Sequence, residues 1–554
     1  AATLGSQDQI ANDFYQRGIK AQAHSAWDEA AAAYEAAVAR RNTHSGYWYY
    51  RLGQVLANAG RFEEAAHAYR QTRQLQRLQN QPSAAQRRRR GLMQTLLFVE
   101  AMETLPLAPR TVLYESYAGR SIGCNPYAIY QTIVDDPAFA GWQHVWVLND
   151  ASRAPADCLH RDNVVFVARD SDLYIRHLAT AKWLINNTTF PYYYLRREGQ
   201  QYLNTWHGTP LKTLAKDIHS SFMEHKNVAR NLLQATHLAS PNAHTSQVLV
   251  RGDDLEGILQ AKLAETGHAR NDLVLNATDE QRQRFRQKLG LAEDATKPLV
   301  LYAPTWRGEL GRQSLDAKQL RQNLAALSQL DCQLVFRGHY FSEQLLAKSK
   351  LDVLVAPQAW DTSELLAITD VLITDYSSIF FDFMPTGRPI LFYTYDEDEY
   401  RRQRGLYFDM AALPGPNCAS IDALKEALHH TLGQLNQGQW QPDATYLQAQ
   451  RRFCPHEDGQ ASGRVVDFFF HDSQQFVVPA APDARKTLLF YVGPFIPNGI
   501  TTAALNLLHA IDPQRYRIVV AIDPASVGHD PKRLEKFAQL PDHVQVIARV
   551  GQQS

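Results

Sequence analysis

Short apolar strands alternate with helix-length segments over most of this chain, and that alternation constrains its fold more than any other feature. The strand-like runs are 111–117, 143–148, 164–168 and 182–186, then 298–303, 333–336, 370–374 and 389–393. Amphipathic segments of helical length lie between them, near 126–135 and 171–180. This pattern is typical of parallel sheets in α/β domains. We therefore expect two Rossmann-like domains, over residues 106–275 and 276–475, because 554 residues are too many for one core.

The first hundred residues repeat with a period of 35. The pairs that share this offset are Phe14/Tyr49, Gly18/Gly53, Trp27/Phe62, Glu29/Glu64, Ala30/Ala65, Ala31/Ala66 and Tyr34/Tyr69. The order of aromatic, glycine and small residues resembles the tetratricopeptide repeat, in which small residues let paired helices approach closely. We expect residues 1–105 to be all-α repeats, capped by a helix within 74–104. They would serve either as a docking platform, for a protein partner or self-association, or as a helical spacer.

Three consecutive strands of the second predicted domain end in residues that bind anions. Arg307 follows the strand 298–303, Arg337 and His339 follow 333–336, and Ser377-Ser378 follows 370–374. A strand that turns into a helix at two serines offers hydroxyls and unpaired N–H groups to a phosphate. Arginine adds a planar fork for a bidentate contact. Each residue alone has a structural alternative, such as helix capping, but their convergence on one sheet edge predicts a phosphate site.

A histidine lies between a tryptophan and a glycine at Trp206-His207-Gly208, directly after the strand-like segment 201–204. Strand ends in open α/β sheets usually carry the ligand site. An imidazole with an ordinary pKa near 6.5 is largely neutral at pH 7 and can accept a proton. We predict that His207 is a general base, although a lone histidine more often has no chemical role.

Composition and local motifs exclude several classes of protein and of site. Basic and acidic side chains balance at 57 each, so a dedicated nucleic-acid binder is not expected. No Asp-x-Asp motif lies on a strand-end loop in the middle of either predicted α/β unit to hold Mg²⁺, and Asp253-Asp254 and the acidic run 396–399 are interpreted as solvated surface or helix starts. No run of eighteen apolar residues could span a bilayer. We expect a cytoplasmic protein, at most peripheral on the inner face of the cell membrane, that uses no metal or cofactor.

Seven motifs occur in one order between residue 111 and about residue 470. They are 114–117 with Asn125-Pro126, 181–187, 206–212, 303–307, 337–339, 373–378 with 381–383, and 404–409. In this order they resemble the CDP-glycerol glycerophosphotransferase family, of the teichoic-acid and capsule polymerase type. The resemblance implies an α/β fold of the GT-B type and transfer of a polyol phosphate from its CDP-activated form to a hydroxyl of a growing polymer.

The resemblance also implies roles for individual residues. His207 matches the histidine that deprotonates the acceptor, and His339 matches the histidine that contacts the donor pyrophosphate and the departing CMP. The expected donor-binding and phosphate-binding residues are Thr305, Arg307, Arg337, Ser377, Ser378 and Gly208. Asp375 and Asp382 are expected to order the phosphate loop and the following helix. Glu115 and Asn125 are candidates either for acceptor contact or for a purely structural role.

Several alternatives remain open. Tyr340 and the segment 267–269 depart from the family pattern, which leaves glycerol or ribitol as the donor polyol. A hexosyltransferase of the same fold and an inactive assembly scaffold also fit the motifs. We expect a CDP-activated polyol as donor and a polymer or lipid-linked acceptor. Residues 476–554 predict a linker and the truncated start of a further glycosyltransferase domain, with strands at 487–492 and 517–522 and a helix at 501–511.

Overall fold

The computed structural model describes residues 4–40, 46–79, 84–159, 161–218, 222–291, 296–305, 307–309, 312–314, 317–338, 353–356, 360–478 and 485–549. The chain divides into two compact units. The first contains Ala1–Thr205, Arg230–His237 and Val550–Ser554, and the second contains Trp206–Ala229 and Leu238–Arg549. The boundary falls within α9 (Lys226–Gln234) and at the start of β6 (His237–Ser240). The four segments proposed as domains from the sequence remain a prediction.

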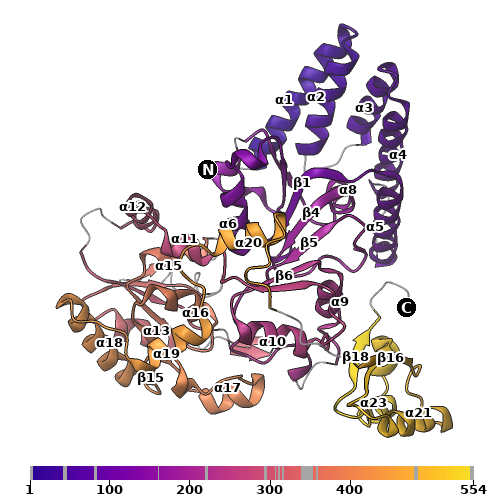
Figure 1. Cartoon of the computed structure of the whole chain (residues 1–554). Coiled ribbons are helices and arrows are strands. Elements are labelled where there is room, and N and C mark those ends of the chain that lie inside the picture. Colours follow the sequence, from indigo (N-terminus) through magenta and orange to yellow (C-terminus); the bar gives the residue numbers. More distant parts are fainter. Residues whose placement is uncertain are drawn as a thin grey trace. The chain divides into compact units, whose positions relative to one another are not determined.

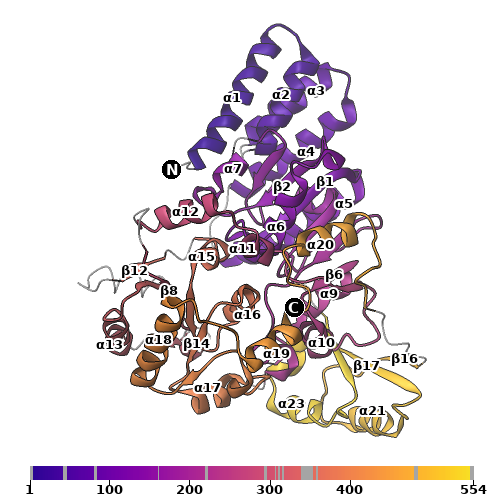
Figure 2. The same cartoon turned by 60° about the vertical axis from the view of Figure 1, so that its left-hand side comes forward.

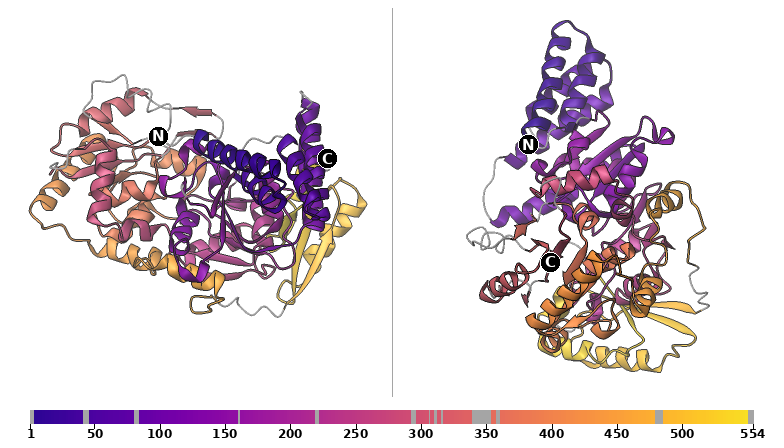
Figure 3. Two further views of the ribbon diagram at one scale, coloured as in Figure 1. Left: turned by 90° about the horizontal axis from the view of Figure 1, so that it is seen from above. Right: turned by 90° about the vertical axis from the view of Figure 1, so that its left-hand side faces the viewer.

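The first unit begins with five helices, of which α1 packs antiparallel to α2 and α3 to α4 (Figures 1 and 3). They are α1 (Leu4–Ala23), α2 (Trp27–Arg40), α3 (Gly46–Asn58), α4 (Phe62–Gln79) and α5 (Ala84–Thr104). A Cβ atom added to Gly18 would lie 2.8 Å from the Tyr34 ring, and one added to Gly53 would lie 2.8 Å from the Tyr69 ring. The 35-residue period therefore repeats one glycine–tyrosine contact. The all-α region is confirmed, while its assignment to the tetratricopeptide class remains a prediction.

A parallel sheet follows these helices in the first unit. Its strands there are β1 (Ala108–Glu115), β2 (Gln143–Val147), β3 (Val164–Val167), β4 (Ala181–Asn186) and β5 (Gln201–Asn204), in the order β3-β2-β1-β4-β5. The connecting helices are α6 (Cys124–Ile133), α7 (Ala156–Leu159) and α8 (Asp172–Thr180), with short 3₁₀ turns η1 (Tyr117–Gly119), η2 (Pro137–Phe139) and η3 (Ala151–Arg153). Helix α5 joins this core, because the fully buried Phe98 ring contacts the rings of Tyr193 and Tyr194.

The second unit is built on a six-stranded parallel sheet. Its strands are β8 (Leu299–Tyr302), β11 (Gln333–Phe336), β12 (Leu354–Val355), β13 (Val371–Thr374), β14 (Ile390–Tyr393) and β15 (Asn417–Cys418). They lie in the order β12-β11-β8-β13-β14-β15. Strand β8 shows why the sheet is covered on both faces: Leu299 and Leu301 belong to one apolar cluster, and Val300 and Tyr302 to another.

The other elements of the second unit surround this sheet or precede it. They are η4 (Ala215–Asp217), α10 (Ala243–Gly252), β7 (Lys262–Glu265), α11 (Asn271–Leu275), α12 (Asp279–Lys288), the antiparallel pair β9 (Arg307–Glu309) and β10 (Arg312–Ser314), α13 (Ala317–Leu327), α15 (Thr362–Ile368), α16 (Ile379–Phe383), η5 (Met384–Thr386), α17 (Glu397–Arg404), η6 (Met410–Ala412), α18 (Ile421–Asn436), α19 (Ala444–Phe453) and α20 (Ala461–Phe470).

The order of these strands fixes where a ligand site can form. From β8 the chain proceeds outward to β11 and β12, then returns to the other side of β8 as β13. The crevice at such a reversal, beyond the carboxyl ends of the two strands, is the usual ligand site of an open α/β sheet. Residues 303–305 and 375–378 follow β8 and β13 and therefore border that position.

The last part of the second unit is a small three-stranded parallel sheet (Figure 2). It contains β16 (Lys486–Tyr491), β17 (Tyr516–Ile522) and β18 (Gln545–Ala548), with α21 (Gly499–Ala510), α22 (Pro524–Gly528) and α23 (Pro531–Phe537). The predicted strand–helix–strand step is confirmed.

The interpretation of Asp253-Asp254 as solvated surface or a helix start was wrong, because both residues are buried. Asp254 pairs with Lys216 and accepts a hydrogen bond from the Val546 backbone N–H at 3.1 Å.

Candidate functional site

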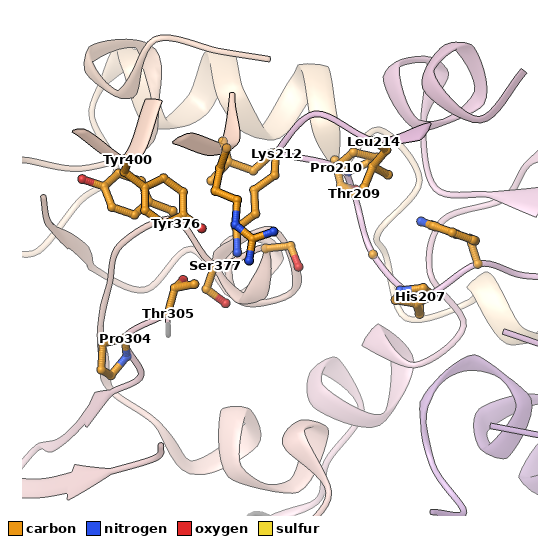
Figure 4. A pocket seen from close by; sticks show the side chains of 15 residues that line it. His207, Thr209, Pro210, Lys212, Leu214, Pro304, Thr305, Tyr376, Ser377 and Tyr400 are labelled. Carbon is orange, nitrogen blue, oxygen red and sulfur yellow. The ribbon is translucent and has the colours of Figure 1, made fainter. Parts of the chain in front are cut away.

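A pocket of about 400 Å³ lies in the second unit, beside the carboxyl ends of β8 and β13. Its volume is within the range usual for small-molecule sites. Four separate stretches of the sequence line it, and Figure 4 shows their side chains. The lining residues are Trp206 to Lys212, Leu214, Pro304, Thr305, Tyr376, Ser377, Ser378, Tyr400 and Arg404. The predicted base and the predicted serine pair thus border one cavity.

The strand ends on one side of the pocket are cross-linked by hydrogen bonds. The Asp375 carboxylate accepts from the Thr305 backbone N–H at 2.8 Å, and the Thr374 hydroxyl donates to the Ala303 carbonyl at 2.8 Å. Asp375 therefore orders the loop after β8, in keeping with its expected supporting role. Because the donor is a backbone group, a side-chain change at Thr305 would leave this link in place.

Ser377 and Ser378 lie where the chain turns into α16. The Ser377 hydroxyl accepts from the Ile379 backbone N–H at 3.4 Å, and the Ser378 side chain makes no capping hydrogen bond to the helix. Helix α16 has only five residues, so its dipole contributes little. Anion binding at this end would depend mainly on the two hydroxyls and the nearby backbone N–H groups.

The loop that carries His207 is held by side chains from elsewhere in the second unit. Arg270 Nη1 donates to the His207 carbonyl at 2.8 Å, and the Asn242 side-chain amide donates to the Thr209 hydroxyl at 3.1 Å. His244 Nε2 lies 2.8 Å from the Pro210 carbonyl. The Trp206 and His207 rings lie 4.4 Å apart. The imidazole is therefore presented on an anchored segment of backbone.

The same loop is joined further along to the motif 404–409. The Tyr407 backbone N–H donates to the Leu211 carbonyl at 2.9 Å, and the Thr213 hydroxyl donates to the Arg404 carbonyl at 2.7 Å. The Leu214 backbone N–H donates to the Tyr407 hydroxyl at 3.1 Å. Two motifs that are separate in the sequence therefore form one wall of the pocket.

Two cationic side chains of the pocket were missed by the sequence prediction. Lys212 and Arg404 both line the cavity. Lys212 Nζ lies 5.6 Å from the centroid of the Tyr400 ring, which stacks on Tyr376 at 3.9 Å. Their signal was available, because Lys212 ends the motif 206–212 and Arg404 begins the motif 404–409. Together they place two positive charges beside the serine hydroxyls.

Arg270 was also missed, although it follows the segment 267–269 that departs from the family pattern. Its guanidinium contacts the Asp382 carboxylate at 2.7 Å and 2.8 Å, and both side chains are largely buried. Burial raises the pKa of the Asp382 carboxyl, and the neighbouring Arg270 charge opposes that rise. Asp382 is thus tied to the His207 loop through Arg270.

Three predicted donor-binding residues are not placed in the pocket by the described structure. Arg337 donates from Nη2 to the Trp360 carbonyl at 2.8 Å and is not among the lining residues. The Arg307 backbone belongs to β9, but its side chain lies outside the described part of the chain, and so does all of His339. Their proposed contacts with the donor remain predictions.

Glu115 and Asn125 lie in the first unit. The Glu115 carboxylate at the end of β1 is fully buried, accepts from the Tyr174 hydroxyl at 2.7 Å and lies 3.2 Å from Arg169 Nε. Burial raises the pKa of Glu115 to about 7. The Asn125 amide, also buried, donates to the Thr205 carbonyl at 3.4 Å. These contacts favour the structural alternative for both residues.

The residues in the described ranges show neither a metal site nor a membrane span. Among those residues, no group of three or more His, Cys, Asp or Glu side chains could hold a metal ion. No helix in the same ranges is both long and apolar enough to cross a bilayer. The acidic run 396–399 begins α17, as expected, and Asp396 accepts a hydrogen bond from the Tyr376 hydroxyl at 3.1 Å.

Comparison with known proteins matches the greater part of the chain. The family model described as CDP-Glycerol:Poly(glycerophosphate) glycerophosphotransferase matches residues 97–471. A teichoic acid poly(glycerol phosphate) polymerase of Bacillus spizizenii is 31% identical over 385 residues, which are 66% of this chain and 92% of that protein. The polymerase of the same name from Bacillus subtilis is 30% identical over 386 residues, which are 66% of this chain and 49% of that protein.

A solved structure of the wall teichoic acid polymerase TagF has a TM-score of 0.60 and 27% sequence identity, and the match covers 72% of this chain and 97% of that one. This likeness and the parallel sheets confirm the expected α/β fold of the GT-B type. The chain belongs to the CDP-glycerol:poly(glycerophosphate) glycerophosphotransferase family.

Proposed function

We propose that this protein transfers glycerol phosphate from CDP-glycerol to a hydroxyl group of a growing teichoic-acid-like or capsule polymer and releases CMP. One observation carries the proposal: the His207 loop, the Ser377-Ser378 turn and the cations Lys212 and Arg404 border a single pocket. A base beside an anion-binding rim is what phosphoryl transfer to a hydroxyl requires. Family membership supplies the class of donor.

In the proposed reaction, the neutral His207 imidazole accepts the proton of the acceptor hydroxyl. The acceptor oxygen forms a bond to the phosphorus that carries glycerol, and the bond from that phosphorus to the bridging oxygen of CMP breaks. The electron pair leaves with CMP. Lys212 and Arg404 would balance the charge of the pyrophosphate, and the hydroxyls of Ser377 and Ser378 would donate to its oxygens. These roles follow from the position of each side chain at the pocket.

We propose that the reaction needs no divalent metal. Lys212 and Arg404 line the pocket, and positive side chains can stabilise the charge on a pyrophosphate that a metal ion would otherwise neutralise. His339 and Arg307 are proposed to assist the departing CMP from the segments that follow β11 and β8. The expected result is full activity in a metal chelator.

The acceptor is proposed to be the end of a polyol phosphate polymer carried on a lipid, so that the protein works peripherally at the inner face of the membrane. We further propose that the N-terminal helices dock a protein partner or a second copy. Exposed aromatic side chains on α3 and α4 support this, because Tyr47 is 58% exposed and Phe62 is 70% exposed.

A donor assay tests the proposal. The protein is incubated with a lipid-linked glycerol phosphate primer and CDP-glycerol, CDP-ribitol or a UDP-sugar, with and without EDTA, and the released nucleotide is identified. We expect CMP from CDP-glycerol, unchanged by EDTA and absent in His207→Ala. CMP from CDP-ribitol alone would change the donor, and UDP from a UDP-sugar would indicate a hexosyltransferase. Release of no nucleotide from any donor would contradict the enzymatic proposal and favour a scaffold.

A further inference from the structure

We infer that Arg270 is a positioning residue, which holds the His207 loop against the helix that carries the phosphate-binding serines. The inference rests on the proposed role of His207 as the base. Arg270 lies just before α11 and lines no part of the pocket, so it acts through other residues. It adds a requirement that the residues lining the pocket do not show.

The geometry of one guanidinium group carries the inference. Arg270 Nη1 donates to the His207 carbonyl at 2.8 Å. Its Nη2 donates to both Asp382 oxygens, at 2.8 Å and 2.7 Å, and its Nε lies 3.2 Å from Oδ1. The planar guanidinium group of Arg270 therefore binds the Asp382 carboxylate through Nη2 and Nε and donates to the His207 loop through Nη1. Lysine carries the same charge but cannot present this rigid set of donors.

Asp382 belongs to the short helix that begins directly after the serine pair. Ser378 is the N-cap residue of α16 and Asp382 is its fourth residue. Because a helix moves as a unit, fixing Asp382 also fixes the turn that presents Ser378. The guanidinium thus ties the backbone of the proposed base to the element that holds the proposed phosphate ligands.

The close approach at Gly208 supports this tie independently. A Cβ atom at Gly208 would lie 3.3 Å from the Ser378 hydroxyl and 3.6 Å from Arg270 Nη2. The backbone after His207 therefore lies close to both side chains, and an added methyl group would be in tight contact with the serine and in ordinary contact with the arginine. His207, Ser378 and Arg270 meet at one point of the second unit.

Burial makes the pair sensitive to the loss of one partner. The Arg270 and Asp382 side chains are 9% and 11% exposed. Removing one member of such a pair leaves a buried charge unpaired, whereas replacing both by apolar residues is often neutral for stability. A double apolar variant therefore separates the two roles: it restores the stability of the core, but it does not restore the donor to the His207 carbonyl.

The test compares Arg270→Met/Asp382→Leu and Arg270→Lys with the wild type. Arg388→Met is the matched control, because Arg388 is a half-buried arginine that donates to the Ala367 and Thr369 carbonyls away from the pocket. We expect the double variant to fold with a wild-type melting temperature, to bind CDP-glycerol within about threefold of the wild-type Kd, and to lose about 100-fold in kcat. Arg270→Lys should lose about tenfold in kcat.

Hydrogen exchange of the peptide 204–212 supplies a readout that does not need activity. We expect faster exchange in the double variant and in Arg270→Lys, and wild-type exchange in Arg388→Met. Wild-type kcat and wild-type exchange in the folded double variant would overturn the inference. If the wild type released no CMP in the donor assay, the proposed function would fail, while the exchange rates would still decide whether Arg270 anchors the loop.

Discussion

Gly208→Ala should weaken donor binding through one identifiable contact. The new methyl group would lie 3.3 Å from the Ser378 hydroxyl, a few tenths of an ångström closer than ordinary contact, and 3.8 Å from Ser378 Cβ, which is ordinary contact. The hydroxyl is free to rotate about the side-chain bond, so it should turn away from its present position. A phosphate hydrogen bond to a charged group is worth about 1.5–3 kcal/mol, so its loss should raise the KM for CDP-glycerol roughly 10- to 150-fold.

A double-mutant cycle with Ser378→Ala isolates this contact. In the Ser378→Ala background, the offending oxygen is gone and the nearest remaining atom is Arg270 Nη2 at 3.6 Å, so the methyl group fits. The backbone φ of 158° at Gly208 adds a strain that is equal in both backgrounds and cancels in the cycle. We therefore expect strongly non-additive effects on kcat/KM, measured by CMP release with varied CDP-glycerol. Simple additivity of the two substitutions would refute the reasoning.

Two further predictions concern stability. Gly18→Ala should destabilise the N-terminal helices by about 1–2 kcal/mol, because the added methyl group meets the fully buried Tyr34 ring. Gly53→Ala should be near neutral, because the Tyr69 ring that its methyl group meets is 37% exposed and can rotate toward solvent. Hydrogen exchange of the N-terminal helices measures the loss of stability in each of the two variants, and equal losses in Gly18→Ala and Gly53→Ala would contradict the prediction. Burial raises the pKa of Asp253 to about 8. Between about pH 4 and pH 8 the Asp253 carboxyl therefore stays protonated in the folded protein but is ionised in the unfolded chain. The free energy of unfolding consequently falls as the pH rises toward 8. Asp253→Asn should reduce the pH dependence of the free energy of unfolding by up to about 1.4 kcal/mol per pH unit. Urea unfolding at pH 5, 6.5 and 8 measures this dependence, and the same dependence in the variant and the wild type would contradict the prediction.

The parts of the fold that were predicted correctly depend on short-range patterns. The buried runs after residues 298, 333, 370 and 389 became β8, β11, β13 and β14, because a strand buried on both faces has an apolar sequence whatever its neighbours are. The 35-residue period was also correct, since Gly18 and Tyr34 recur as Gly53 and Tyr69 with the same contact. The interpretation of Asp253 and Asp254 as solvated failed, because their burial depends on Lys216 and on β18, both distant in the sequence.

The candidate site was predicted only in part for the same reason. His207 was found because it lies shortly after β5, and Ser377 and Ser378 were found because they lie shortly after β13, since the loops beyond strand ends usually carry the ligand site of an open α/β sheet. Lys212 and Arg404 were passed over although both belong to recognised motifs, since the sequence alone does not distinguish a cation that faces solvent from one that faces a cavity. For Glu115 the sequence left acceptor contact and a structural role open, and its enclosure with Tyr174 and Arg169 in the core of the first unit favours the structural role.

The sequence by itself determined the class of fold, the strand ends at which the site was expected and the identity of the proposed base. Each of these depends on hydrophobic periodicity or on the residues that follow a strand, and both are local features that span only a few residues. Only the tertiary structure decided what holds that base in place. Arg270 and Asp382 are 112 residues apart, and Thr213 and Arg404 are 191 apart. A buried polar group must find a partner wherever the topology brings one, so such pairs follow from the packing of the whole unit rather than from any local pattern.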